Sequence, residues 1–419
     1  MPEAETPGAI QYRRRHMRLL AATFALFVIG WSAERKVISP QSLRMDGPYS
    51  PGILVNDFLY VSGQGGLAVD GAPPGAFEAQ ARQSLNHVKE VVTAAGLSME
   101  HVVYAHVYLK DMANYDAFNI VWRDFFPKAP PAQGILGVHA MPGGSTVLIN
   151  AVAFRDLSRK RVIAPRGYPS GIVSPAVMAG ERIFVSACLG RDLDGRIPAD
   201  PGAQVQTAFD HMKNILVEAK LNFRHMVFIN PYQTDTVQSV MNKIYAQHFE
   251  FGNTPARATI RATSLPYGTN IAFTGVGISD LSKRRAIKPK NMAPSATASP
   301  CVFADDTLYC SAKSAFIPPN EGIYIPTVEG QVVMSMRSQL DSLDEADLKA
   351  SDIVSMTLYL DNISDLPKAS GVLGRYFPSR SVTGSTVSQT APREQGSQAQ
   401  PDGRARFPSL EQFSIIAVK

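Results

Sequence analysis

The chain has 419 residues, of which 45% are apolar and 18% charged, an ordinary composition for a globular protein long enough to hold several cores. The formal net charge of +5 is too small to indicate a nucleic-acid-binding protein. The three cysteines, Cys188, Cys301 and Cys310, do not have metal-ligand spacing. An odd count argues against a disulfide framework, so we interpret all three as small buried apolar side chains.

The N-terminal segment differs in kind from the rest of the chain. A basic block, Arg13–Arg18, precedes an uncharged apolar run, Leu19–Ala33, which is shorter than the ~20 residues of a membrane-spanning helix and fits the apolar region of an export signal. Trp31 fits a cleavage site poorly. Three interpretations therefore stand: a cleaved signal of a periplasmic or secreted protein, an uncleaved membrane anchor, or a mis-assigned start in a cytoplasmic protein that begins at Met45. We favour export or anchoring, with residues 1–33 outside the fold.

The remaining chain repeats one pattern three times. The motif at Val37–Pro40 returns at Val162–Pro165 and at Ala286–Pro289, which are steps of 125 and 124 residues by the numbering. Solenoid repeats are ~20–50 residues long, whereas this period is the size of a whole small domain. We therefore predict three tandem domains that together form a pseudo-trimer, over residues 34–157, 158–281 and 282–419.

The first copy shows the expected elements most clearly. A hairpin at 53–62 is followed by a helix whose apolar stripe runs from Ala81 to Ala95 and ends at Gly96. A strand at 102–109 precedes a second helix, which Asn114 can cap. Two final strands are predicted at 135–139 and 147–154. The order β-β-β-α-β-α-β-β predicts an α+β domain with its helices on one face of a sheet.

The later copies follow the same plan, and the third departs from it near its end. We expect helices at 207–219, 240–249 and 333–343 and strands at 227–233, 259–263, 271–278, 354–360 and 412–418. Before the last strand, Gln389–Arg404 is rich in Gln, Gly, Ser and Pro. This composition predicts a flexible polar insertion in the third copy.

Several motifs together resemble those of one family. They are Gly47–Ser50, Val61–Gln64, Gln80–Asn86, Leu109–Met112 and Asn119–Phe126 in the first copy, and Thr254–Ala258 with Leu265-Pro266 in the second. These residues resemble the RidA family (YjgF/YER057c/UK114), the reactive-intermediate imine deaminases. The resemblance covers nearly all of residues 34–419 and weakens from the first copy to the third.

The resemblance implies a trimer of chorismate-mutase-like α+β domains with ligand clefts between neighbours. In the family, the arginine of a Pro-Ala-Arg motif holds the carboxylate of an enamine or imine acid. Water then hydrolyses the imine to a keto acid and ammonia without metal or cofactor, and a glutamate in the last strand helps to position or activate that water. A planar guanidinium suits a carboxylate because the two groups form parallel hydrogen bonds.

The chain departs from the family pattern at these two positions. The arginine position reads Gln133 in the first copy, Arg257 in the second and, by our alignment, Arg380 in the third. The glutamate position reads Leu148, Ala272 and Gln412. No copy has both the arginine and the glutamate, so we assign no catalytic residue.

We therefore expect unequal clefts that bind a small carboxylate or imine acid. The one at Arg257 would be the competent cleft, with Ser186 and Asn242 supporting it and Tyr49 reaching in from the first copy. A weaker cleft would use Arg380, and the cleft at Gln133 has lost its carboxylate-binding arginine. Ser62 and Gly63 are further candidates for substrate contacts at a cleft floor.

Three functions follow in order of preference. The first is a RidA-like deaminase, which Arg257 supports and the missing glutamate opposes. The second is a protein that binds or senses a small carboxylate without turnover. The third is an endoribonuclease, an activity also known in the family, but the sequence shows no histidine pair, carboxylate cluster or basic groove for phosphodiester chemistry. We predict no nucleic-acid partner, no metal and no cofactor.

Overall fold

The computed structural model describes residues 35–43, 45, 47–67, 75–168, 171–290, 292, 295–317, 322–392, 398–399 and 403–419. The predicted export segment Leu19–Ala33 lies outside these residues, so its interpretation stays a prediction. None of the helices in the described ranges combines the length and the apolar character that crossing a bilayer requires.

The first copy folds into a six-stranded sheet with the strand order β1-β2-β3-β6-β4-β5. Its strands are β1 (Arg35–Ile38), β2 (Gly52–Val55), β3 (Phe58–Gly65), β4 (Val102–Leu109), β5 (Ala132–Gly137) and β6 (Val147–Phe154). Helix α1 (Phe77–Ala94) packs on β3 and β6 through the predicted apolar stripe, and α2 (Tyr115–Phe125) packs on α1. Gly96 follows α1 with a φ of +78°, a conformation that favours glycine and ends the helix.

The expected capping role of Asn114 is wrong. Asn114 occupies the N-cap position of α2 but makes no side-chain cap bond there. Instead the Asp111 side chain accepts a hydrogen bond of 2.9 Å from the Ala113 N–H, and so caps the single 3-10 turn that leads into α2. Because the helical segment already begins with this capped 3-10 turn, Asn114 does not act as a side-chain cap.

The second copy repeats this sheet, in the order β11-β10-β13-β9-β8-β7, with β12 also paired to β10. Its strands are β7 (Lys160–Ile163), β8 (Ala176–Ala179), β9 (Arg182–Leu189), β10 (Met226–Gln233), β11 (Ala256–Arg257), β12 (Ile260–Arg261) and β13 (Ile271–Ile278). Its helices are α3 (Pro201–Glu218) and α4 (Gln238–Tyr245). The Asp200 carboxylate caps α3 through the Ala203 N–H at 2.6 Å. The single strand predicted at 259–263 is thus two short strands.

The third copy has the same order again, β14-β15-β16-β21-β17-β18. Its strands are β14 (Arg284–Ile287), β15 (Cys301–Ala304), β16 (Thr307–Lys313), β17 (Ile353–Leu360), β18 (Thr383–Ser388) and β21 (Glu411–Val418), and its helices are α5 (Val328–Asp344) and α6 (Leu366–Leu373). The predicted insertion is not wholly irregular, because β19 (Gln398–Ala399) pairs with β20 (Ala405–Arg406) as a small ribbon.

Each copy carries the same β-bulge in its third strand. The pairing with the last strand shifts between Val61 and Gln64, between Val185 and Cys188, and between Cys310 and Lys313. The bulges therefore contain the equivalent serines Ser62, Ser186 and Ser311. A bulge redirects a side chain out of the regular alternation of a strand. Here it places each serine hydroxyl against the neighbouring copy.

The bulge serines join the three copies in a cycle. Ser186 Oγ accepts from the Gln133 N–H at 2.8 Å, Ser311 Oγ from the Arg257 N–H at 2.8 Å, and Ser62 Oγ from the Gly384 N–H at 2.9 Å. Each hydroxyl also donates to its own copy, at 2.6 Å, to the carbonyl of Ser174, Ser299 or Ser50. The first copy thus meets the second, the second meets the third, and the third returns to the first. One chain closes a pseudo-trimer.

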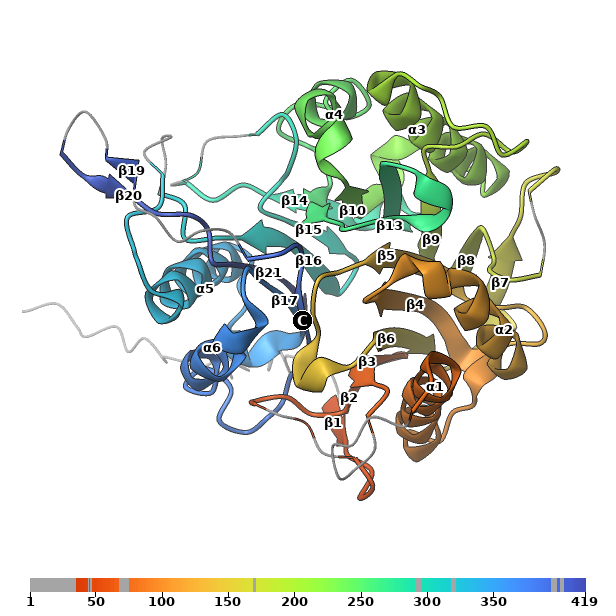
Figure 1. The fold of residues 1–419 in the computed structure, drawn as a ribbon, viewed down its shortest axis with the longest axis horizontal. Helices are drawn as coiled ribbons and strands as arrows, with labels where there is room; N and C mark the ends of the chain where they lie inside the picture. The colour runs from red at the N-terminus through yellow and green to blue at the C-terminus, as the bar shows by residue number, and fades with distance from the viewer. Residues whose placement is uncertain are drawn as a thin grey trace, which may run out of the picture. The chain divides into compact units, whose positions relative to one another are not determined.

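The three sheets enclose a shared apolar core. Figure 1 shows the three sheets on the inside of the fold and the helices α1–α6 around them. Ile53, Phe184 and Val302 belong to one cluster of buried residues that draws on all three copies. Each copy also has a core of its own, which lies between its sheet and its helices. The copies are thereby fixed to one another by apolar burial as well as by hydrogen bonds.

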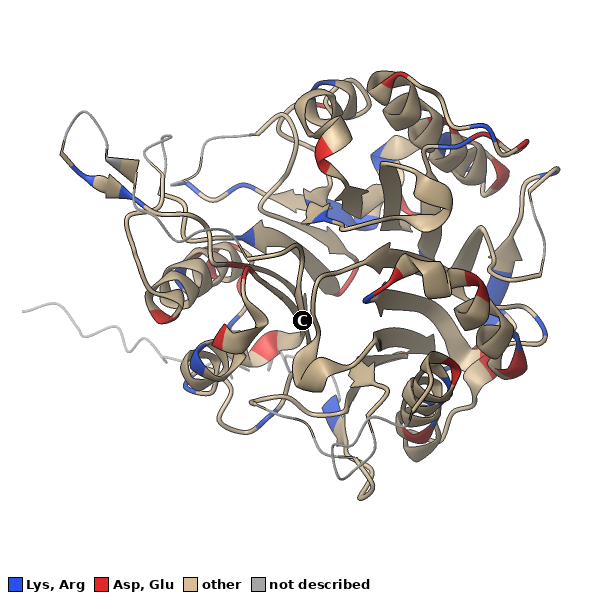
Figure 2. Cartoon of the chain, in the orientation of Figure 1, with Lys and Arg blue, Asp and Glu red and all other residues tan. Residues whose placement is uncertain are grey.

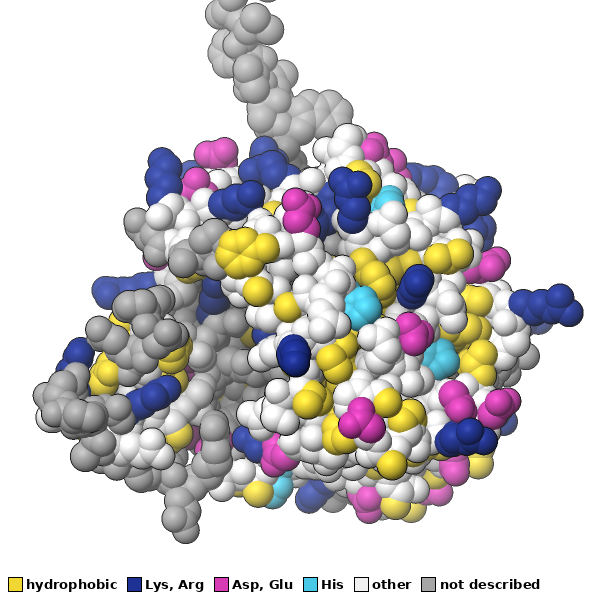
Figure 3. Space-filling model, turned by 90° about the horizontal axis from the view of Figure 1, so that it is seen from above, with side chains coloured by type: hydrophobic (Ala, Val, Ile, Leu, Met, Phe, Trp, Pro, Cys, Tyr) yellow, Lys and Arg dark blue, Asp and Glu magenta, His cyan; other side chains and the backbone are white. Residues whose placement is uncertain are grey.

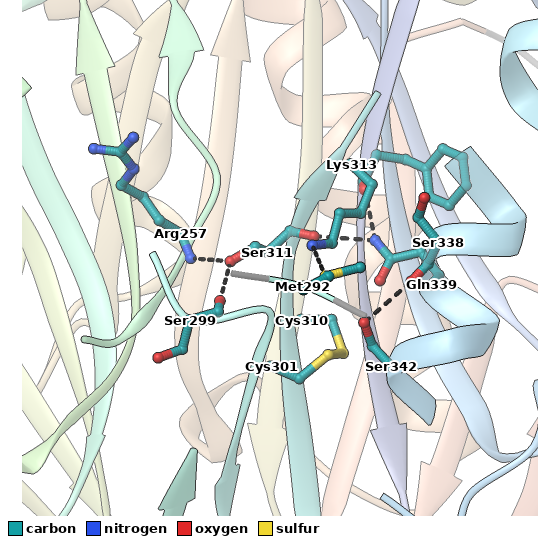
Figure 4. Close-up of a disulfide and its surroundings, with 11 residues drawn as sticks. Arg257, Met292, Ser299, Cys301, Cys310, Ser311, Lys313, Ser338, Gln339 and Ser342 are labelled. Atoms are coloured by element: carbon teal, nitrogen blue, oxygen red, sulfur yellow. Dashed lines mark hydrogen bonds between the residues drawn. A yellow bond between two sulfur atoms is a disulfide. The ribbon is translucent and has the colours of Figure 1, made fainter. Parts of the chain in front are cut away.

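Two of the three cysteines do not have the expected state. Cys301 and Cys310 lie directly opposite each other on β15 and β16 and form a disulfide, shown in Figure 4. The equivalent pairs in the other copies are Gly52 with Val61 and Ala176 with Val185. Cys188 is free and buried, as expected, and burial raises the pKa of its thiol.

Removing one serine of the cycle tests its contribution to stability. We expect Ser186→Ala to lower the free energy of unfolding by about 1–3 kcal/mol, because the buried Gln133 N–H and Ser174 carbonyl lose their partner. The measurement is urea unfolding, with the exposed Ser351→Ala as control. Equal midpoints for the two variants would show that the cycle does not hold the copies together.

Candidate functional site

The serine cycle identifies one equivalent position in each cleft between copies. Gln133, Arg257 and Gly384 each donate their N–H to the bulge serine of the next copy. The sheet register agrees, because these residues pair with Ala105, Ile229 and Met356, each the fourth residue of its strand. We call these three residues the anchor positions. Only the cleft between the second and third copies has an arginine there.

Arg380 is therefore not the third anchor, and our alignment was wrong. It lies four residues before Gly384, as Ala129 lies before Gln133, and both Arg380 and Ala129 have positive φ values, of +51° and +44°. The Arg380 side chain is exposed, and its carbonyl oxygen accepts a hydrogen bond from Ser50 Oγ. The loop before β18 contains an arginine near the expected position. Sequence spacing alone did not show that this arginine lies four residues before the anchor position.

Arg257 lies on the cleft face of its edge strand. Residues 257, 259 and 261 are partly exposed while the alternate residues 256, 258 and 260 are buried, as a strand edge with one covered face requires. The Arg257 guanidinium donates to Asn242 Oδ1 at 2.7 Å and lies 5.0 Å from the centre of the Tyr245 ring. Its backbone N–H bonds to Ser311, as Figure 4 shows.

This arrangement suits an anion. Burial lowers the pKa of Arg257, yet a guanidinium stays charged at neutral pH. It has five N–H donors in a planar fork, and Asn242 takes one of them. Asn242 and the Tyr245 ring fix the orientation of the group, so a carboxylate in the cleft meets a positioned donor. Asn242 is the predicted site residue that the structure does bring to Arg257.

The other predicted residues lie in different clefts. Ser186 belongs to the cleft between the first and second copies, because its hydroxyl bonds to Gln133. Ser62, Gly63 and Tyr49 belong to the cleft between the third and first copies. The serine at Arg257 is Ser311, the bulge serine of the third copy, and only the cyclic order of the copies assigns it to this cleft.

Tyr49 fills the cleft between the third and first copies. Its side chain is 4% exposed and packs in the core of the third copy. A Cβ atom at Gly384 would overlap the Tyr49 ring, so an anchor side chain and this tyrosine exclude each other. Burial also raises the pKa of Tyr49. In this cleft an aromatic ring occupies the space that a ligand-binding side chain would need.

The cleft between the first and second copies holds a cavity lined by apolar, aromatic and charged side chains. It lies beside Ser186, has a volume of about 260 Å³, and its lining includes Tyr115, Tyr267 and Arg191. Tyr115 and Tyr267 meet edge to face with ring centres 5.4 Å apart. The anchor here, Gln133, is buried and carries no charge. This cleft has space but lacks a cation at the anchor position.

The three residues that we aligned with the family's glutamate are equivalent to one another in the sheets. Leu148, Ala272 and Gln412 pair with Tyr108, Tyr232 and Tyr359, which are equivalent residues of β4, β10 and β17. None of the three is a carboxylic acid. In the Arg257 cleft, the Gln412 amide donates to the Thr259 carbonyl oxygen at 3.0 Å. A neutral amide thus takes the place of the acid.

The charged residues outside the clefts do not gather by sign. Figure 2 shows acidic and basic residues interspersed over helices and loops, and Figure 3 shows both signs mixed with apolar side chains on one face. Within the described ranges, no three His, Cys, Asp or Glu side chains group as metal ligands. Of the three anchor positions, the one at Arg257 carries a positive charge.

A family model described as Endoribonuclease L-PSP matches residues 40–155 and 166–273, together more than half of the chain. The chain belongs to this family, the RidA family of its motifs. RidA relatives include a 2-iminobutanoate/2-iminopropanoate deaminase of Capra hircus, 38% identical over 109 residues, which are 26% of this chain and 80% of the relative. The Bos taurus deaminase of the same name is 36% identical over 125 residues, 29% of this chain and 91% of the relative.

Solved structures of single RidA-type domains also match. The YjgF gene product of E. coli is 32% identical, with a TM-score of 0.28, over 29% of this chain and 99% of that chain. E. coli TdcF with bound serine is 30% identical, with a TM-score of 0.28, over the same shares. Each relative corresponds in extent to about one of the three copies.

A double-mutant cycle can measure the overlap between the Tyr49 ring and a side chain added at Gly384. We expect Gly384→Ala to destabilise the chain by about 1–3 kcal/mol, because the added methyl group overpacks the Tyr49 ring. In a Tyr49→Ala background the same change should cost little, since the ring is gone. Urea unfolding of the four proteins gives the coupling, and additive effects would show that the ring does not fill this cleft.

Proposed function

We propose that this RidA protein hydrolyses enamine or imine acids to 2-keto acids and ammonia in the cleft between its second and third copies. The observation that supports the proposal is the single arginine among the three anchor positions, Arg257, oriented by Asn242 at 2.7 Å. The deaminase names of the relatives agree with this reaction class.

The proposed hydrolysis requires the protein to bind the substrate in one orientation and to assist proton transfer. Water adds to the C=N carbon, the tetrahedral adduct loses ammonia, and a C=O group replaces the C=N group. Arg257 holds the carboxylate and so presents the imine carbon in one orientation, which lowers the entropic part of the barrier. An imine is already electrophilic, so positioning and proton transfer matter more than a strong nucleophile.

Replacing Arg257 tests the binding step. We expect Arg257→Ala to weaken binding of 2-oxobutanoate, a stable product analogue, by about 10- to 100-fold, the loss of charge-assisted hydrogen bonds. Isothermal calorimetry measures the affinity. Arg380→Ala is the matched control, since it removes an exposed arginine outside the anchor positions and should leave the affinity unchanged. Unchanged affinity for Arg257→Ala would refute the assignment.

A second candidate function is binding without turnover. It is favoured by Gln412, which stands where the family has its glutamate and whose amide is engaged with Thr259. An amide neither accepts nor supplies a proton at neutral pH. Such a protein would sense or sequester a small carboxylate in the same cleft.

One competition assay separates turnover from binding. An amino-acid dehydratase generates a short-lived imine, semicarbazide traps it, and the deaminase would compete with the trap. We expect the wild-type chain to lower the yield of semicarbazone and Arg257→Ala to restore it. No competition by wild type, together with retained binding of 2-oxobutanoate, would favour the binding function instead.

A further inference from the structure

The cavity beside Ser186, between the first and second copies, takes no part in the proposed deaminase. Its volume is about 260 Å³. Cavities for drug-sized ligands measure ~300–1,000 Å³, so this one has room for a smaller molecule. Among its lining residues, Leu193 is 46% exposed and Tyr267 is 53% exposed. The cavity therefore reaches the protein surface, where a ligand can enter.

A small side chain leaves this space open. In the cleft between the third and first copies, the buried Tyr49 ring fills the volume at the anchor position. The equivalent residue of the second copy is Val173, at the same numbering step as the other repeated motifs, and it lines the cavity. The exchange of a tyrosine for a valine thus accounts for a cavity in one cleft and a filled space in the other.

Arg191 supplies this cavity with a cation that does not come from an anchor position. Its guanidinium lies 4.0 Å from the centre of the Tyr267 ring, and both side chains line the cavity. Stacking on a ring uses the face of a guanidinium and leaves its in-plane N–H donors available to an anion. In the described part of the chain, no carboxylate lies at ion-pair distance from Arg191.

Hydrogen bonds fix the backbone at Arg191. His211 Nε2 lies 2.6 Å from the Arg191 carbonyl oxygen, and this nitrogen carries the hydrogen because a carbonyl only accepts. His211 Nδ1 lies 3.0 Å from the Tyr168 hydroxyl, so the ring is held at both nitrogens. The acidic residue of the lining, Asp192, accepts from the Arg196 N–H at 2.7 Å and so stabilises the turn that follows Arg191. The cation is therefore positioned.

Tyr267 has an unusual backbone conformation. Its φ is +60°, in the left-handed region that disfavours bulky residues, and the equivalent residue of the first copy is Gly143, with a φ of +64°. Contacts of the ring offset this cost, because it packs on Arg191 and meets the Tyr115 ring edge to face. Strained residues of this kind concentrate at ligand sites. Tyr115 and Tyr267 give the cavity an aromatic wall from two copies.

We propose that this cavity binds an aromatic carboxylate. The carboxylate pairs with the in-plane N–H donors of Arg191. The ring packs against Tyr115, Tyr267 and Val173. Aromatic rings attract one another in offset and edge-to-face contacts, so an arene gains more here than a saturated ring of equal size. A short aliphatic keto acid has no ring for these walls. The inference does not rest on the proposed function, because it uses no residue of the Arg257 cleft.

Three probes separate the charge from the ring. Phenylacetate has both, phenylacetamide keeps the ring with a neutral amide, and cyclohexylacetate keeps the charge on a saturated ring. Ligand-observed NMR titration of the full chain gives each dissociation constant. The titrations are carried out in wild type and in Arg257→Ala, which lacks the arginine of the anchor position and so shows the cavity of Arg191 alone.

In Arg257→Ala we expect phenylacetate to bind at least 10-fold more tightly than phenylacetamide, because the amide lacks the charge-assisted pair with Arg191. It should bind about 3-fold more tightly than cyclohexylacetate. Adding Arg191→Gln should bring phenylacetate to the level of phenylacetamide and leave phenylacetamide itself unchanged. Arg196→Gln is the matched control, since it removes an exposed arginine of the same turn that does not line the cavity.

Tyr267→Gly tests the aromatic wall and carries the test if Arg191→Gln does not fold, because the first copy already has a glycine at this position. We expect it to abolish the preference for phenylacetate over cyclohexylacetate while the preference over phenylacetamide remains. No binding of phenylacetate to Arg257→Ala, or an affinity that Arg191→Gln leaves unchanged, would overturn the proposal.

Discussion

The structure depends on the hydrogen bond between a bulged serine of one copy and the edge strand of the copy before it. An uncovered sheet edge presents free N–H and C=O groups that pair with other chains. In each copy that edge carries the anchor residue, and Ser186, Ser311 or Ser62 covers it from the next copy. Three such contacts close a ring, so each cleft is formed by two copies and its chemistry depends on both.

Joining the copies in one chain allows the clefts to differ. In a trimer of identical subunits every cleft has the same residues, whereas here the anchor positions are Gln133, Arg257 and Gly384. Their surroundings differ as well: Tyr49 occupies the space at Gly384, and a cavity lined by aromatic side chains and Arg191 lies beside the cleft of Gln133. The cleft of Arg257 keeps a cation and adds a polar cavity beyond Thr259. The fold is threefold, but of the three anchor positions only Arg257 carries a charge.

Sequence periodicity predicted several strands with their bounds, but it did not predict which residues lie together in one cleft. The strands at 102–109, 147–154 and 271–278 have the predicted bounds, because alternation and flanking turns define them locally. The assignment of Arg380 depended on a short loop motif, in which an arginine four residues before the anchor position was taken for the anchor itself. The disulfide followed from the register of β15 with β16, which a count of cysteines does not contain. Tyr49 was placed in the wrong cleft because the cyclic order of copies is a tertiary property.

The central claim is that one of three similar clefts binds a carboxylate at its anchor position. The number of 2-oxobutanoate molecules bound per chain tests it most directly. It can be measured by calorimetry at protein concentrations above the dissociation constant or by equilibrium dialysis. The account predicts one ligand per chain. Two or three equivalent sites per chain would contradict it, because they would require the clefts at Gln133 or Gly384 to bind an anion without an arginine at the anchor position, and so would the absence of any binding.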